Sequence, residues 1–139
     1  IIFSKRMDIS DHLERHKLGD LFLDTFNVNA HTTTSDSLWA GLPVLTLAGK
    51  SFSARVSSSL LTAVGMEELI TENLNDYEKL AIELANNKTK LINIKQKLKE
   101  NVKNYSLFNT ELYCKNLETA YKKVYDNYFL GKEPQDFLI

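Results

Sequence analysis

Short apolar runs alternate with helical patterns through the first half of the chain, and this alternation constrains the fold more than any other feature. The apolar runs occupy residues 1–4, 21–25, 43–47 and 68–71. Helical patterns lie between them, at about residues 10–19, 33–40 and 51–64. Strands that alternate with helices through short loops are typical of a parallel sheet covered by helices. The sequence therefore predicts an α/β fold, with a parallel sheet and helices on both of its faces.

The second half, from about residue 73, contains no convincing strand. Asn75 and Glu78 have the spacing of a capping box and predict a helix through about residue 85. A second helix is predicted over residues 89–104 and a third from about Asn109. We expect the apolar stripe of the third helix to pack against the protein; it comprises Tyr113, Leu117, Ala120, Val124 and Tyr128. We thus predict two portions, a ligand-binding sheet over residues 1–72 and an all-helical tail over 73–139 that packs on the same lobe.

The overall composition excludes several classes of protein. A formal net charge of −1 argues against a partner that is nucleic acid or a membrane surface. The single cysteine, Cys114, forms no internal disulfide, and we expect it to fill a core or half-buried position. No apolar run reaches about 18 residues and no secretory signal is present. We therefore expect a cytoplasmic protein with no membrane partner.

Hydrogen-bonding side chains gather in the sequence "HTTTSD", residues 31–36, between the run at 21–25 and the next helix. In open parallel sheets, ligands bind outside the carboxyl ends of the strands. A helix that begins there offers unpaired amides and the positive end of its dipole to a phosphate. The hydroxyls of residues 32–34 would add donors, and His31 could donate to a phosphate oxygen or a leaving group.

Asp36 gives this pattern a more specific meaning. A carboxylate against a diphosphate would repel it, so Asp36 fits such a site only if it faces a neutral group with hydroxyls, such as a ribose diol. A purely structural interpretation also fits the residues. Threonine caps are common, the helix dipole favours an aspartate in the first turn, and a histidine before a helix often satisfies a backbone carbonyl.

A longer stretch decides between these interpretations. Residues 11–61, and above all "LFLDT…N.HTT..D.LWAGLPVLT", resemble the C-terminal catalytic lobe of the O-linked N-acetylglucosaminyltransferase family, especially bacterial members with tetratricopeptide repeats. The resemblance continues through "YEKLAIEL", "LFNTELYCKNLETAYKKVYDNYF" and "GKEP", and so covers nearly the whole chain. It implies the GT-B architecture, in which two Rossmann-like lobes enclose the donor, UDP-N-acetylglucosamine, without a required metal or cofactor.

The resemblance also implies roles for individual residues. His31, Thr32 and Thr33 would hold the diphosphate and the leaving group, and Asp36 would accept a hydrogen bond from the ribose. His12 and Arg15 would lie beside the uracil and ribose. A histidine and an arginine at i and i+3 share one helical face and can clamp a flat base, although the same pair also fits a polar surface turn.

We expect four further side chains near the predicted site to have structural roles. We expect Arg55 to form an internal salt bridge rather than to reach a phosphate. Trp39 and Leu38 are expected to be buried against the sheet. Asp24 is expected to hydrogen-bond the turn that follows its strand.

The chain also departs from the family pattern. Ile9 stands where animal members have a lysine on the nucleoside side. The family's general base, acceptor groove, a diphosphate-binding lysine and the repeats would all lie before residue 1, and the apolar opening without a methionine predicts a piece of a longer protein. We therefore expect a fragment of a glycosyltransferase that modifies Ser or Thr of acceptor proteins, inactive in isolation. The alternatives are a non-catalytic nucleotide-binding or interaction module, or a related transferase with another donor or acceptor.

Overall fold

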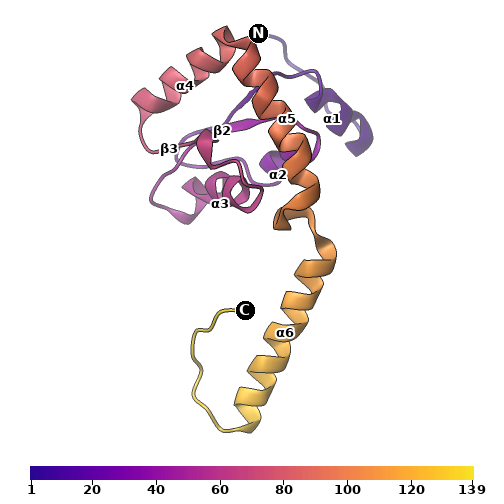
Figure 1. Cartoon of the computed structure of the whole chain (residues 1–139), viewed down its shortest axis with the longest axis vertical. Helices are drawn as coiled ribbons and strands as arrows, with labels where there is room; N and C mark the ends of the chain where they lie inside the picture. The colour runs from indigo at the N-terminus through magenta and orange to yellow at the C-terminus, as the bar shows by residue number, and fades with distance from the viewer. The chain divides into compact units, whose positions relative to one another are not determined.

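A computed structural model describes all residues, 1–139, and shows an α/β chain (Figure 1). Its contacts divide it into two compact units, unit 1 (Ile1–Leu107) and unit 2 (Phe108–Ile139). The helices are α1 (Ile9–His16), α2 (Thr32–Trp39), α3 (Val56–Ala63), α4 (Leu74–Asn86), α5 (Lys88–Asn104) and α6 (Thr110–Phe129). The strands are β1 (Phe22–Leu23), β2 (Val44–Leu47) and β3 (Ile70–Thr71), and the short 3₁₀ helices are η1 (Phe52–Ala54), η2 (Glu67–Leu69) and η3 (Ser106–Phe108).

The three strands form a parallel sheet in the order β1-β2-β3. Phe22 pairs with Val44 in the first ladder, and Thr46 pairs with Ile70 in the second. The helices α3 and α4 both contact β2 and lie on opposite sides of it in Figure 1. The predicted parallel sheet with helices on both faces is therefore confirmed.

The core is built around the central strand. Val44, Leu45 and Thr46 of β2 are fully buried. Each surrounding helix contributes a fully buried leucine, namely Leu38 (α2), Leu61 (α3), Leu84 (α4) and Leu98 (α5). Burying one such side chain contributes roughly 1.5–3 kcal/mol, so these helices owe their positions mainly to the core that they share.

The first predicted strand is wrong. Residues 1–4 have no regular structure, and Ile1, Ile2 and Phe3 are almost fully exposed. A strand is defined by hydrogen bonds to a neighbouring strand, and no segment of the described chain pairs with this one. An apolar run is therefore insufficient evidence of a strand when no partner strand lies beside it.

The predicted helices exist, but three of their start positions differ. The helix predicted from about residue 51 is α3, which begins at Val56 after the short 3₁₀ helix η1. Helix α1 begins at Ile9 with Asp8 at the N-cap, so Ser10 lies inside the helix. Helix α4 begins at Leu74, where the side-chain oxygen of Asn73 accepts from the Asp76 amide at 2.9 Å. Asn73 and Asp76 are three residues apart, as are the predicted Asn75 and Glu78. Spacing alone therefore could not decide which asparagine caps the helix.

Helices α4 and α5 belong to the compact unit that contains the sheet. Helix α4 contacts β2 and β3, and α5 contacts α2 and α4. The ammonium of Lys95 on α5 donates to the Gly19 carbonyl at 3.1 Å and to Asp20 at 2.9 Å, and it holds the pKa of the Asp20 carboxyl below its ordinary value. Unit 1 therefore continues to residue 107, whereas the change in sequence character lies near residue 73.

The apolar stripe of α6 is exposed. Tyr113, Leu117, Val124 and Tyr128 are between 36% and 76% exposed. Cys114, on the same helix, is exposed too. The expected burial of Cys114 is wrong. The packing of the stripe on the lobe stays a prediction, because an amphipathic pattern identifies a helix face without identifying a partner for it. None of the helices, α6 included, combines the length and apolarity that a membrane span requires.

Candidate functional site

Helix α2 begins beyond the carboxyl end of β1 and is not capped by its own chain. The Ser35 amide donates to the His31 carbonyl at 3.2 Å, so the amides before Ser35 have no partner in the helix. His31 is the N-cap residue and its side chain makes no capping hydrogen bond. Asparagine side chains cap α4, α5 and α6, whereas the starts of α1 and α3, like that of α2, have no side-chain cap. The start of α2 therefore presents free hydrogen-bond donors at the edge of the sheet where ligands bind.

Asp24 fixes the loop that leads into α2. One oxygen of its carboxylate accepts from the amides of Thr25 at 2.9 Å and Ala30 at 2.8 Å. The other oxygen accepts from the Thr46 hydroxyl on β2 at 2.7 Å. The expected bond from Asp24 to the following turn is thus confirmed, and the residue is buried. A satisfied buried carboxylate holds the loop in one geometry before any ligand binds.

Tyr77 on α4 also holds Asp24, through the backbone carbonyl of that residue. Its hydroxyl donates to the Asp24 carbonyl at 3.0 Å, and its ring packs edge-to-face on Phe26 with centroids 5.0 Å apart. Burial of the Tyr77 hydroxyl, followed by the nearby Asp24 carboxylate, raises the pKa of Tyr77 above its ordinary value. The loop before α2 is therefore anchored to the sheet and to α4.

The third threonine of "HTTTSD" is structural. Thr34 is fully buried, and its hydroxyl donates to the Ala30 carbonyl at 2.9 Å. The Ser57 hydroxyl on α3 lies 2.8 Å from that of Thr34 and 2.9 Å from the same carbonyl. Only two of the three threonine hydroxyls are consequently free for a ligand, which corrects the expectation that all three add donors.

The remaining polar residues of α2 share an accessible face. His31, Thr32 and Thr33 are exposed, and Asp36 is half-buried. Asp36 lies four residues after Thr32 and three after Thr33, so the three side chains lie on one side of the helix. No protein group donates to the Asp36 carboxylate, which stands in the second turn rather than the first. The helix dipole alone is therefore a poor explanation for this aspartate.

His12 and Arg15 lie together on α1, as their spacing predicts. An Nη of Arg15 lies 2.7 Å from Nδ1 of His12, and the other Nη donates to the Lys5 carbonyl at 3.3 Å. The His12 ring also packs edge-to-face on His16, with centroids 4.5 Å apart. Both predicted residues are half-buried, and α1 contacts α2. The predicted base-binding pair and the predicted phosphate-binding turn therefore belong to neighbouring helices.

A family comparison covers all of these residues. The model of glycosyl transferase family 41 matches residues 1–117. The chain belongs to this family.

Two plant proteins illustrate the relatives of this family 41 chain. The first, a probable UDP-N-acetylglucosamine–peptide N-acetylglucosaminyltransferase named SEC from Arabidopsis thaliana, is 39% identical over the whole chain. The second, the SPINDLY protein of the same organism with the same described activity, is 33% identical over 94% of the chain. The chain spans only 14% and 15% of the lengths of these two relatives.

A solved structure supports the fold of the family 41 chain. The match is a mutant O-GlcNAc transferase from Thermobaculum terrenum, with a TM-score of 0.78 and 30% sequence identity. It covers 84% of this chain and 22% of the solved chain. The α/β arrangement is thus that of a glycosyltransferase lobe.

The family 41 site contains a hollow and an exposed ring that the sequence did not reveal. A hollow of about 340 Å³ lies where the three strands end, between residues that follow β1, β2 and β3, among them Asn27, Lys50 and Glu72. Phe52 on η1 is 83% exposed, and its ring centroid lies 6.3 Å from that of His31. The hollow and the closeness of Phe52 to His31 both depend on loops that meet only in the folded chain. No local sequence pattern could therefore predict them.

Two expectations about neighbouring side chains are wrong. Arg55 forms no ion pair and instead lines an open groove of about 900 Å³ along α3. Trp39 is 57% exposed, whereas Leu38 is fully buried as expected. Consecutive residues on a helix point about 100° apart, so burial of Leu38 directs Trp39 away from the sheet.

Proposed function

We propose that this chain is the donor-binding part of a glycosyltransferase that transfers N-acetylglucosamine from UDP-N-acetylglucosamine to Ser or Thr of proteins. The uncapped and exposed start of α2, at the carboxyl edge of the sheet, is the observation that carries the proposal. The activities for which the SEC and SPINDLY relatives and the bacterial O-GlcNAc transferase are named support the choice of donor and acceptor.

The diphosphate would bind at the first turn of α2. Backbone amides, the Thr32 and Thr33 hydroxyls and His31 would donate to its oxygens, and the helix dipole would favour its charge. Asp24 and Ser57 hold the loop before this turn, so the donors are in position before the ligand arrives. Preorganised donors lose little free energy through ordering when the ligand binds.

The nucleoside would bind along α2 and α1. Asp36 would accept from the ribose hydroxyls, because its carboxylate has no donor within the protein and lies on the same face as Thr32. His12 and Arg15 would flank the uracil and ribose. Their mutual contact at 2.7 Å holds both side chains in one place, which favours stacking on a flat ring.

Catalysis by this lobe would be electrostatic. When the bond between the sugar and the diphosphate breaks, negative charge develops on the departing UDP. The α2 amides, the two threonine hydroxyls and His31 would stabilise that charge, so we propose that no metal or other cofactor is required. The general base and the acceptor groove would come from other parts of a longer parent protein, one that carries tetratricopeptide repeats and acts in the cytoplasm. The isolated chain would bind the donor without transferring the sugar.

Titration of the 139-residue chain with UDP tests this proposal. We expect saturable binding that weakens about tenfold in Thr32→Ala and in Asp36→Ala, because each removes one hydrogen bond in which one of the two groups is charged. The matched controls are Thr119→Ala and Asp126→Ala on α6, which should leave the affinity unchanged. Asp36→Ala should have no effect on the binding of 2′,3′-dideoxy-UDP, since that ligand lacks the hydroxyls. Absence of UDP binding, or binding equal to wild type in both variants, would contradict the assignment.

A further inference from the structure

We propose that Phe52 is a specificity-determining residue whose ring supports the sugar of the donor. This inference rests on the proposed function and deepens it, because it assigns the hexose a surface that neither the sequence motif nor the family match identifies. The ring lies in the loop after β2, next to His31 of the loop after β1.

The position of the ring places it beside the diphosphate site. The Phe52 and His31 rings meet edge-to-face at an interplanar angle of 88°, with centroids 6.3 Å apart. Two rings at that distance are direct neighbours. Any group attached to a phosphate held by His31 therefore comes next to Phe52. In a nucleotide sugar, one such group is the hexose.

The backbone that carries Phe52 is held on both sides. The Asn29 amide donates to the Ser53 carbonyl at 2.8 Å, and the Ser53 hydroxyl donates to the Asn27 carbonyl at 3.2 Å. The Gly49 amide donates to the Ala54 carbonyl at 2.8 Å. The first two bonds join the loop after β2 to the loop after β1, and the third closes the loop after β2 on itself, so the segments that carry Phe52 and His31 are held together.

Close packing also fixes this loop. A Cβ atom at Gly49 would lie 2.5 Å from the Cβ of Ala54, so only glycine allows the two segments to approach so closely. The ring of Phe52 nonetheless remains 83% exposed. The backbone of the loop thus places an aromatic side chain at the surface, where it packs against little of the protein.

The chemistry of a hexose fits this surface. A pyranose presents C–H bonds on its faces and hydroxyls on its rim, so an aromatic ring can cover a face while polar side chains bind the rim. Lys50 and Arg55 line the groove next to Phe52 and are in no ion pair. They supply hydrogen-bond donors at the edge of the same surface. UDP alone has no hexose and would not use the ring.

The test compares UDP with UDP-N-acetylglucosamine on the full 139-residue chain by calorimetry. Loss of the ring in Phe52→Ala should weaken binding of the nucleotide sugar about 3- to 10-fold, while UDP affinity stays within about twofold of wild type. Phe52→Tyr keeps the ring and should keep the wild-type ratio of the two affinities. Phe129→Ala removes an exposed ring from α6 and is the matched control. Unchanged thermal unfolding of each variant would show that folding is intact.

The outcomes separate this inference from the proposed function. If wild type binds UDP but Phe52→Ala leaves the ratio of affinities unchanged, the inference is wrong and the nucleotide site stands. If Phe52→Ala weakened the binding of UDP and of UDP-N-acetylglucosamine equally, Phe52 would act through His31. That result would also overturn the inference. If wild type binds no UDP, the proposed function fails and the inference fails with it. If Phe52→Ala in the parent enzyme raised only the KM for the acceptor, the ring would contact the acceptor instead of the donor sugar. That result would also contradict the inference.

Discussion

Asp24 shows how one side chain prepares the candidate site. Its carboxylate accepts three hydrogen bonds, two from the loop before α2 and one from β2. The sequence predicted the first contact, to the adjacent turn, because aspartate at a strand end commonly bonds the next residues. The bond to Thr46 joins residues 22 positions apart, so it depends on the pairing of β1 with β2.

Tyr77 leads to a prediction about alkaline pH. Its folded-state pKa is raised, chiefly by burial, so the neutral hydroxyl is favoured in the fold. The stabilisation is fully present below the unfolded-state pKa of about 10 and is lost as the pH rises through the higher folded-state pKa. We expect the free energy of unfolding to fall with pH in that window, and to fall less steeply in Tyr77→Phe.

Denaturant unfolding between neutral pH and pH 11 measures this difference. At neutral pH, Tyr77→Phe should lose about 1 kcal/mol, the contribution of the bond to the Asp24 carbonyl. Tyr121→Phe, an exposed tyrosine of α6, serves as the control and should follow wild type throughout. An equal pH slope in wild type and Tyr77→Phe would refute the role of the buried hydroxyl.

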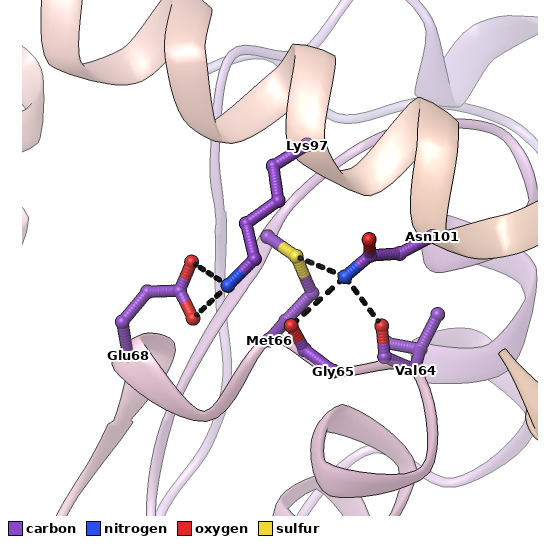
Figure 2. Close-up of polar contacts among 6 residues, drawn as sticks. All are labelled: Val64, Gly65, Met66, Glu68, Lys97 and Asn101. Carbon is purple, nitrogen blue, oxygen red and sulfur yellow. Dashed lines mark hydrogen bonds and ion pairs between the residues drawn. The ribbon is translucent and has the colours of Figure 1, made fainter. Parts of the chain in front are cut away.

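At the scale of elements, α5 secures the end of α3. Gly65 has a φ of 68°, and the Gly65 and Met66 amides donate back to the carbonyls of Thr62 and Leu61. This Schellman arrangement ends the helix and leaves later carbonyls without partners. Figure 2 shows the Asn101 amide of α5 directed at this turn, where it donates to the carbonyls of Val64 and Gly65, both at 2.9 Å.

Two side chains of α5 should therefore differ in their contributions to stability. Asn101→Ala leaves two buried carbonyls unsatisfied and should cost about 1–3 kcal/mol. Lys97→Met breaks the neighbouring ion pair with Glu68, which Figure 2 also draws; the ammonium nitrogen of Lys97 lies 2.7 Å and 2.8 Å from the two carboxylate oxygens. That pair is exposed, so its loss should cost less than about 1 kcal/mol.

Chemical denaturation of the variants tests this order. Asn104→Ala removes the same amide from an exposed position on the same helix and should change the free energy of unfolding by less than about 0.5 kcal/mol. A loss in Asn101→Ala no larger than in Asn104→Ala would contradict the account.

The elements themselves were largely predictable. The Gly41 and Gly65 stops, both at positive φ, mark the ends of α2 and α3 where the sequence placed them. The errors have physical causes. Residues 1–4 lack a partner strand, and two asparagine caps with equal spacing competed at the start of α4. Asn101 is a polar residue on a buried face, and its partners lie too far away along the chain for a local sequence pattern to identify them.

At the scale of the whole molecule, the division at residue 107 predicts that unit 1 is independent. Every predicted site residue and the whole sheet lie in unit 1. We expect a chain of residues 1–107 to unfold cooperatively, with a midpoint within about 5 °C of the full chain, because its buried core is retained. It should also keep the UDP affinity of the full chain.

Calorimetry and UDP titration of the two chains provide the measurement. A matched truncation after residue 86 removes α5 with its buried Leu91, Ile94 and Leu98, and should abolish cooperative unfolding. Loss of cooperativity already in the chain of residues 1–107 would show that the second unit is needed for the first to fold.

The sequence by itself determined the α/β class and the start of α2, because periodicity and capping are local properties. Its motif also matched the family. Tertiary structure alone decided that Thr34 is buried against Ser57, that Asn101 closes the end of α3, and that Phe52 stands beside His31. These contacts join residues between 21 and 37 positions apart in the chain. The packing of helices on the sheet brings such residues together, and local sequence patterns contain no information about that packing.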